Sequence, residues 1–124
     1  MNNKDINVVQ HFIAHCERIE TYLERCNNSY DEFQGDMLYQ DGIAMQLLAM
    51  GELTTHFSDE FKLAHSDNVD WRNLKQLRNI CAHRYETIDF EILWTIATTE
   101  IPELKAYFTN LMQQAQESNY DLEL

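Results

Sequence analysis

Apolar residues recur at three- and four-residue steps along most of this chain, which is the pattern of amphipathic helices. The first such stretch runs from about residue 4 to 26 and ends at the polar residues 27–29. We expect a second helix from about Asp36 to Phe57, followed by a short helical turn at 59–65. The positions expected to face the core of the two long helices are Ile6, Val9, Ile13, Cys16, Ile19 or Tyr22, Leu23, Leu38, Ile43, Leu47, Met50, Leu53 and Phe57.

Two further helices are predicted in the second half of the chain, each preceded by an aspartate, Asp70 or Asp89, that can cap its first turn. Pro102 either kinks the later helix or opens a new one at its first turn. The tail from about residue 113 is polar and acidic, and we expect it to be frayed. The apolar stripes of these helices are Trp71, Leu74, Leu77 and Cys81, and then Phe90, Leu93, Trp94, Ala97, Ile101, Leu104, Phe108 and Leu111.

These segments predict an all-α protein, an antiparallel bundle of four to five helices forming one domain over residues 1–124. Three glycines and one proline leave few positions that would interrupt a helix. Gly51 lies inside the second helix, where glycine costs about 1 kcal/mol relative to alanine. We therefore interpret Gly51 as a point of close helix packing.

Composition excludes several classes of function. A net charge of -12 argues against nucleic-acid binding over the general surface, because that binding needs cations to meet phosphates. The three cysteines contain no Cys-x-x-Cys pair, which favours a reducing, cytoplasmic location. No basic start is followed by an apolar run, and no stretch approaches the roughly 20 apolar residues that span a bilayer. We expect neither export nor membrane insertion.

One segment departs from this acidity, and we call it the cationic strip: residues 71–85, WRNLKQLRNICAHRY. It holds four of the nine Lys and Arg and no acid, so the rest of the chain sums to -16 (-12 minus 4). Within it, Arg78, His83 and Tyr85 follow the spacing Arg-x4-His-x-Tyr. A guanidinium, an imidazole and a phenol can together hold a phosphate and move protons beside it.

Helical geometry constrains how these groups can meet. Arg78 and His83 would lie about 140° apart on a regular helix, whereas Asn79 and His83 share a face. Either the helix loosens before His83, or two copies of the strip face each other in a composite site. Tyr85 would fall about 20° from Arg78, so we expect its phenol near that guanidinium. Purely structural roles also stay open: Arg78 pairing with an acid, His83 capping a helix and Tyr85 packing in the core.

Residues 69–108, VDWRNLKQLRNICAHRYETIDFEILWTIATTEIPELKAYF, resemble the HepT family of small helical HEPN-type proteins. The family's Arg-x4-His-x-Tyr motif matches at Arg78, His83 and Tyr85, and the similarity covers roughly residues 30–112. Gln76 stands where many members have glycine. The other matching positions are Gly51-Glu52, Asn79, Ile88-Asp89, the aromatic after them and Ile101-Pro102.

The resemblance implies a homodimeric, metal-independent endoribonuclease with no cofactor, the toxin of a type VII toxin–antitoxin system acting on tRNA or mRNA. His83 would be the acid or base for attack of a ribose 2′-hydroxyl on its phosphate, and Arg78 would stabilise the developing charge. An MntA-type nucleotidyltransferase antitoxin would use ATP to place AMP on Tyr85, over Arg78. Supporting roles would fall to Asn79, Arg72, Lys75 and Glu52.

Three other interpretations remain open. The chain could be a non-enzymatic helical partner or nucleotide-binding subunit of a nucleotidyltransferase, with the motif serving docking alone. His11 and His15 are four residues apart and could reach one metal, although Glu17 and Glu20 point elsewhere on the helix. Glu52, finally, could form a salt bridge with an arginine inside the bundle.

Overall fold

The computed structural model describes the backbone of residues 1–83 and 85–123 and the side chains of 1–83 and 85–118. Over these residues it is all-α, as predicted, without strands. The α-helices are α1 (Asn3–Arg25), α2 (Tyr30–Gly35), α3 (Met37–Leu53), α4 (Asp59–Ala64), α5 (Trp71–His83), α6 (Phe90–Thr95) and α7 (Ile101–Glu123). Two 3₁₀ turns (Thr54–His56 and Tyr85–Thr87) and a π-helical turn (Ile96–Glu100) connect them.

Polar side chains set where the helices begin. The two predicted caps are confirmed: a carboxylate oxygen of Asp70 accepts a hydrogen bond from the Asn73 N–H (2.9 Å), and Asp89 accepts one from the Glu91 N–H (2.9 Å). The helix α2 was not predicted. It begins after Ser29, whose hydroxyl accepts a hydrogen bond from the backbone N–H of Glu32.

The end of α1 and the start of α7 each have a local cause. Asn27 and Asn28 adopt left-handed φ angles of 57° and 51°, which asparagine tolerates better than most residues, and they end α1 as expected. In α7, Pro102 occupies the first turn, so the second of the two alternatives for this proline is confirmed. The π-helical turn precedes it, and the Ile101 N–H donates to the Ile96 carbonyl.

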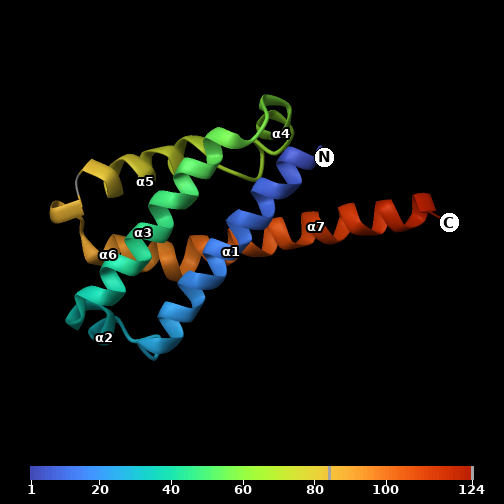
Figure 1. Cartoon of the computed structure of the whole chain (residues 1–124). Helices are drawn as coiled ribbons and strands as arrows, with labels where there is room; N and C mark the ends of the chain where they lie inside the picture. The colour runs from blue at the N-terminus through green and yellow to red at the C-terminus, as the bar shows by residue number, and fades with distance from the viewer. Residues whose placement is uncertain (84, 124) are drawn as a thin grey trace.

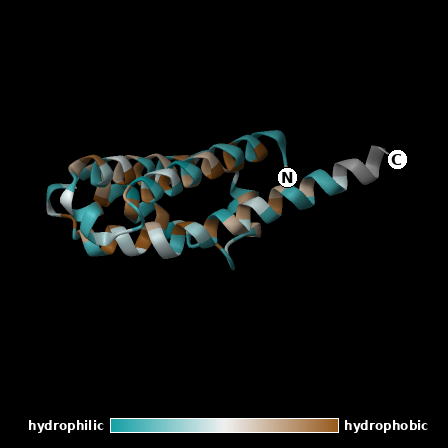
Figure 2. Cartoon of the chain, turned by 90° about the horizontal axis from the view of Figure 1, so that it is seen from below, coloured by the Kyte–Doolittle hydropathy of each residue, from teal (hydrophilic) through white to brown (hydrophobic). Residues whose placement is uncertain are grey.

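The helices pack as an antiparallel bundle in which α3 is central (Figure 1). One side of α3 contacts α1 and another contacts α5, while α1 also contacts α7. The helices α6 and α7 follow one another across the π-helical turn and form one long rod (Figure 1). The polar tail from about residue 113 continues α7, and the coloured part of this stretch in Figure 2 is largely hydrophilic. No described helix is both long and apolar enough to span a bilayer.

The core is aromatic and aliphatic, with Phe12 and Phe108 meeting edge to face at a ring separation of 4.8 Å. Phe12 is completely buried although the helical stripe did not include it. Leu38 is the clear error in the expected core, because 78% of it is exposed. It lies in the first turn of α3, a helix that is apolar on several faces, so periodicity cannot identify the buried one.

Candidate functional site

The helix α5 carries the cationic strip and is anchored to α3 through Gly51. Leu74, Leu77 and Cys81 are the buried residues of α5. A Cβ atom on Gly51 would lie 2.2 Å from the Arg78 Cβ and 2.9 Å from the Leu74 carbonyl oxygen. Only a residue without a side chain permits this approach, so the interpretation of Gly51 as a packing glycine is confirmed.

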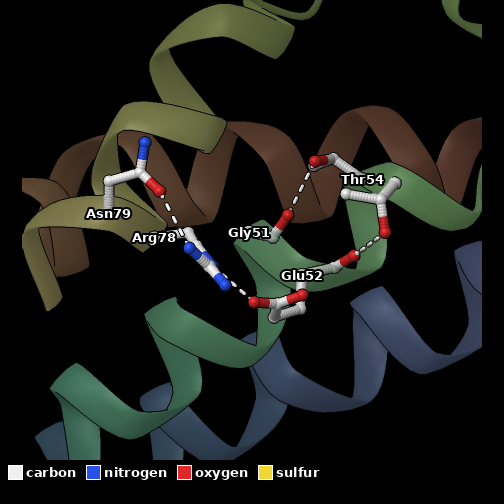
Figure 3. Close-up of polar contacts among 6 residues, drawn as sticks. Gly51, Glu52, Thr54, Arg78 and Asn79 are labelled. Atoms are coloured by element: carbon white, nitrogen blue, oxygen red, sulfur yellow. Dashed lines mark hydrogen bonds and ion pairs between the residues drawn. The ribbon is translucent and has the colours of Figure 1, made fainter. Parts of the chain in front are cut away.

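Arg78 is held from two sides. Its Nε forms an ion pair with the Glu52 carboxylate, and its Nη1 donates to the Asn79 side-chain oxygen over 3.0 Å (Figure 3). The salt bridge expected between Glu52 and an arginine is therefore present. About 35% of the Arg78 side chain is exposed. Within the described part of the chain these contacts use two of its five N–H donors, and the guanidinium remains reachable by an anion.

The outer face of α5 brings Asn79 and His83 together. The two residues are one turn apart and line a single surface hollow with Gln76 and Ile80, which confirms that they share a face. Because Asn79 also accepts a hydrogen bond from Arg78, it lies between the guanidinium and the imidazole.

Arg78 and His83 do not share a face of α5. The helix continues as an α-helix to His83, so the alternative in which it loosens before the histidine is wrong. A site composed of two copies of the strip stays a prediction. Arg72 and Lys75 are exposed in the first half of α5, and Arg72 lies within about 20° of both Asn79 and His83 around the helix. They extend the cationic face along the helix.

Tyr85 lies elsewhere than expected. Its hydroxyl donates a hydrogen bond to the carboxylate of Asp41 on α3. The partner of Arg78, Glu52, is eleven residues further along the same helix, or about 16 Å along its axis. The expectation that the phenol lies beside Arg78, with an attached phosphate over that guanidinium, is therefore wrong within one chain. The helical spacing that placed Tyr85 near Arg78 does not apply there, because α5 ends at His83 and Tyr85 begins a 3₁₀ turn.

The surroundings of Tyr85 keep its phenol protonated. Burial, followed by the hydrogen bond to Asp41 and the negative charge of that carboxylate, raises the pKa of Tyr85 to about 12. Sequence reasoning missed Asp41. The available signal was its isolation, since Asp41 is the sole charged residue between Asp36 and Glu52.

Tyr85 and His83 are nevertheless neighbours at the end of the strip. Both line a surface hollow together with Ala82, Glu86 and Thr87. A group attached to the phenol would therefore lie at the His83 end of α5 and far from Glu52. Arg84, the remaining cation of the strip, lies outside the described residues.

One histidine of the pair on α1, His15, has a partner on another helix. The Nδ1 atom of His15 lies 2.7 Å from the side-chain oxygen of Gln46 on α3, at hydrogen-bonding distance. In the described part of the chain, no group of three or more His, Cys, Asp and Glu side chains is placed to hold a metal ion.

Comparison with known proteins places this chain in a family. The model of the family described as "Ribonuclease HepT-like" matches residues 12–111. A "Putative RNase" of Caldanaerobacter subterraneus subsp. tengcongensis is 26% identical over 107 residues, covering 86% of this chain and 92% of the relative. A "Putative RNase" of Methanocaldococcus jannaschii is 30% identical over 76 residues, covering 61% of this chain and 69% of the relative.

A further relative from Methanocaldococcus jannaschii is named "Gamma-glutamylcyclotransferase and putative RNase". It is 23% identical over 112 residues, which are 90% of this chain but 49% of the relative, so the chain spans about half of that protein. No solved structure gives a significant match. The family match covers α5 and its motif as well as most of the bundle, and the chain belongs to the HepT-like ribonuclease family.

Proposed function

We propose that this protein is a cytoplasmic, metal-independent endoribonuclease that acts as the toxin of a toxin–antitoxin pair. The observation that carries the proposal is the outer face of α5, where Asn79 connects the fixed guanidinium of Arg78 to the His83 turn. The family match covers the same residues. Arg72 and Lys75 add exposed positive charge along this helix, in a protein otherwise too acidic to attract RNA.

The reaction follows from the groups on this face. A ribose 2′-hydroxyl attacks the adjacent phosphorus, the bond from phosphorus to the 5′-oxygen breaks, and a cyclic phosphate and a 5′-hydroxyl result. His83 takes the proton from the nucleophile or supplies one to the leaving oxygen. Arg78 stabilises the charge on the phosphoryl oxygens, and it does so without reorganising because Glu52 and Asn79 already hold it.

A homodimer completes the proposed site. One regular helix leaves Arg78 and His83 about 140° apart, so a second α5 facing the first would bring the arginine of one copy toward the histidine of the other. Ile80 is an apolar residue suited to a dimer contact on this face of α5, because it is 40% exposed and lines the hollow that contains Asn79 and His83.

We also propose that an MntA-type nucleotidyltransferase antitoxin silences the nuclease by transferring AMP from ATP to Tyr85. The hollow shared by Tyr85 and His83 supports this regulation, because an attached nucleotide would occupy the space beside the imidazole. Within one chain the nucleotide would block His83 and would not neutralise Arg78. The guanidinium of Arg78 is paired with Glu52, at the end of the α3–α5 contact opposite to the Tyr85–Asp41 pair.

Cleavage of RNA by the purified protein in the presence of EDTA tests the nuclease proposal. The wild type should cleave, and His83→Ala and Arg78→Ala should not, while all three keep the same helical circular dichroism signal. A non-enzymatic partner of a nucleotidyltransferase would bind that enzyme and leave RNA intact in every variant.

A further inference from the structure

Asp41 and Tyr85 are 44 positions apart in the sequence and meet through the packing of α3 against α5. The phenolic hydrogen of Tyr85 is directed at the Asp41 carboxylate, which is exposed on the outer side of α3. This contact is separate from the Arg78 network. It places an acceptor for a proton on the residue that the proposed regulation modifies.

The walls around this contact are otherwise apolar. Asp41 and Tyr85 line a hollow with Ala44, Met45, Leu48 and Cys81. Burial raises the pKa of the Cys81 thiol to about 11, so that group is neutral near pH 7. Among the described residues that line the hollow, Asp41 is therefore the one that carries charge at neutral pH. None of these described lining residues is a cation that would help the phenol to ionise.

Transfer of AMP to a tyrosine requires that the phenolic oxygen lose its proton. With a pKa of about 12, roughly one Tyr85 side chain in 10⁵ is ionised near pH 7. A reaction that waited for the free phenolate would be slow. A carboxylate that already accepts the hydrogen bond meets the first requirement for a general base, which is contact with the proton to be removed.

We infer that Asp41 is the proton acceptor for adenylylation of Tyr85, an inference that rests on the proposed modification of this residue. The Tyr85 oxygen forms a bond to the α-phosphorus of ATP, and the bond from that phosphorus to the oxygen bridging to the β-phosphate breaks. Pyrophosphate leaves, and the phenolic proton passes to the Asp41 carboxylate. The partner nucleotidyltransferase supplies the bound ATP.

The same residue then favours the silenced arrangement. After modification Tyr85 has no hydrogen to donate, and its new phosphodiester carries a negative charge. Once Asp41 has released the proton to water, like charges repel, and the phosphodiester turns from Asp41 toward the hollow shared with His83. Asp41 thus assists the transfer and directs its product.

The opposite role for Asp41 predicts the opposite result. If the carboxylate only held the phenol in place and out of reach, its removal would free Tyr85 and lower the pKa of the phenol. Both effects would make modification faster. The rate in an Asp41 variant therefore separates a proton acceptor from a restraint.

The experiment compares wild type, Asp41→Asn and Glu86→Gln with the purified nucleotidyltransferase and ATP, following AMP on Tyr85 by mass spectrometry. The Asp41→Asn substitution keeps the size and an acceptor oxygen, but the amide cannot take the proton. We expect modification of this variant to slow by about 100-fold at pH 7 and to recover about tenfold per pH unit, while the wild-type rate stays nearly flat. Glu86→Gln removes the same charge beside Tyr85 without touching the phenol, and it should keep the wild-type rate.

Two results would overturn the inference. One of them leaves the proposed modification of Tyr85 intact, and the other contradicts that modification as well. If wild type is modified on Tyr85 and Asp41→Asn is modified as fast or faster, the base belongs to the partner and the inference alone fails. If wild type receives no AMP on Tyr85, the proposed modification fails with it. Unchanged RNA cleavage by Asp41→Asn confirms in either case that the variant is folded.

Discussion

Gly51 of α3 and Arg78 of α5 approach so closely that a Cβ atom on the glycine would lie 2.2 Å from the Cβ of the arginine. The contact fixes the distance between the two helices at the residue that we propose binds the scissile phosphate. It also places Glu52, the next residue of α3, against the guanidinium. The position of Arg78 therefore depends on a residue that has no side chain.

Gly51→Ala should destabilise the protein and reduce cleavage together. Overpacking of this kind costs about 1–3 kcal/mol, which exceeds the up to about 1 kcal/mol that alanine gains in a helix. Urea denaturation measures the change in the free energy of unfolding. Gly35→Ala is the matched control, because a Cβ atom there meets nothing within 4 Å. Equal stability of the two variants would contradict the close packing of α3 on α5.

Glu52→Gln should affect cleavage far more than stability. Both side chains of the Glu52–Arg78 pair are more than a third exposed, so its loss should change the free energy of unfolding by less than about 1 kcal/mol. Cleavage should fall about tenfold, because the guanidinium would no longer be held. Glu20→Gln breaks the comparable pair with Lys105, which joins α1 to α7, and should leave cleavage unchanged. If both variants cleave alike, Glu52 does not position Arg78.

The burial of Tyr85 and its contact with Asp41 predict a defined pH dependence of stability. The pKa of Tyr85 is about 12 in the folded protein against an ordinary 10, so the protonated phenol stabilises the fold. This contribution is fully present below about pH 10 and is lost as the pH rises to about 12. The free energy of unfolding of the wild type, relative to Tyr85→Phe, should therefore decline across that window. A constant difference would contradict the raised pKa of Tyr85. Phenolate absorbance of Asp41→Asn should show ionisation at lower pH than in the wild type, because the hydrogen bond and the negative charge of Asp41 are lost.

A dimer formed through the outer face of α5 predicts that Ile80→Glu is monomeric. Ile80 is 40% exposed beside Asn79 and His83, and a carboxylate there would be repelled by its copy across the interface. Ile92→Glu is the control, since Ile92 is 60% exposed on α6. Light scattering during size-exclusion chromatography gives the mass of each variant. A wild type that is monomeric at cleavage-competent concentrations would remove the composite site.

The fold was largely predictable because its long helices have strong periodicity and visible caps. The first helix, expected at about residues 4–26, is observed at Asn3–Arg25, and Asp70 and Asp89 act as predicted. The short α2 was missed because six residues give too little periodicity. The Ser29-x-x-Glu32 pattern of a helix start was the signal available for it.

The site was predictable only for relationships between residues of the same helix. The shared face of Asn79 and His83 depends on residues of one helix, and helical spacing predicts it. The pairing of Tyr85 with Asp41 depends on where α5 ends and on how it crosses α3, and neither is encoded in the spacing of the strip. The partner of Arg78 could be anticipated as an acid of the bundle, because a half-buried guanidinium needs one.

Cleavage of a defined RNA in EDTA by wild type, His83→Ala and Arg78→Ala tests the central proposal most directly. Metal-independent chemistry by these two side chains predicts cleavage by the wild type, with loss of at least about 100-fold in each variant and no loss of helicity. Mixing the two inactive variants tests the composite site in the same assay, because half of the sites in a mixed dimer would join an intact arginine to an intact histidine. Cleavage that stops in EDTA and returns with Mg²⁺, or full activity in either single variant, would contradict the account.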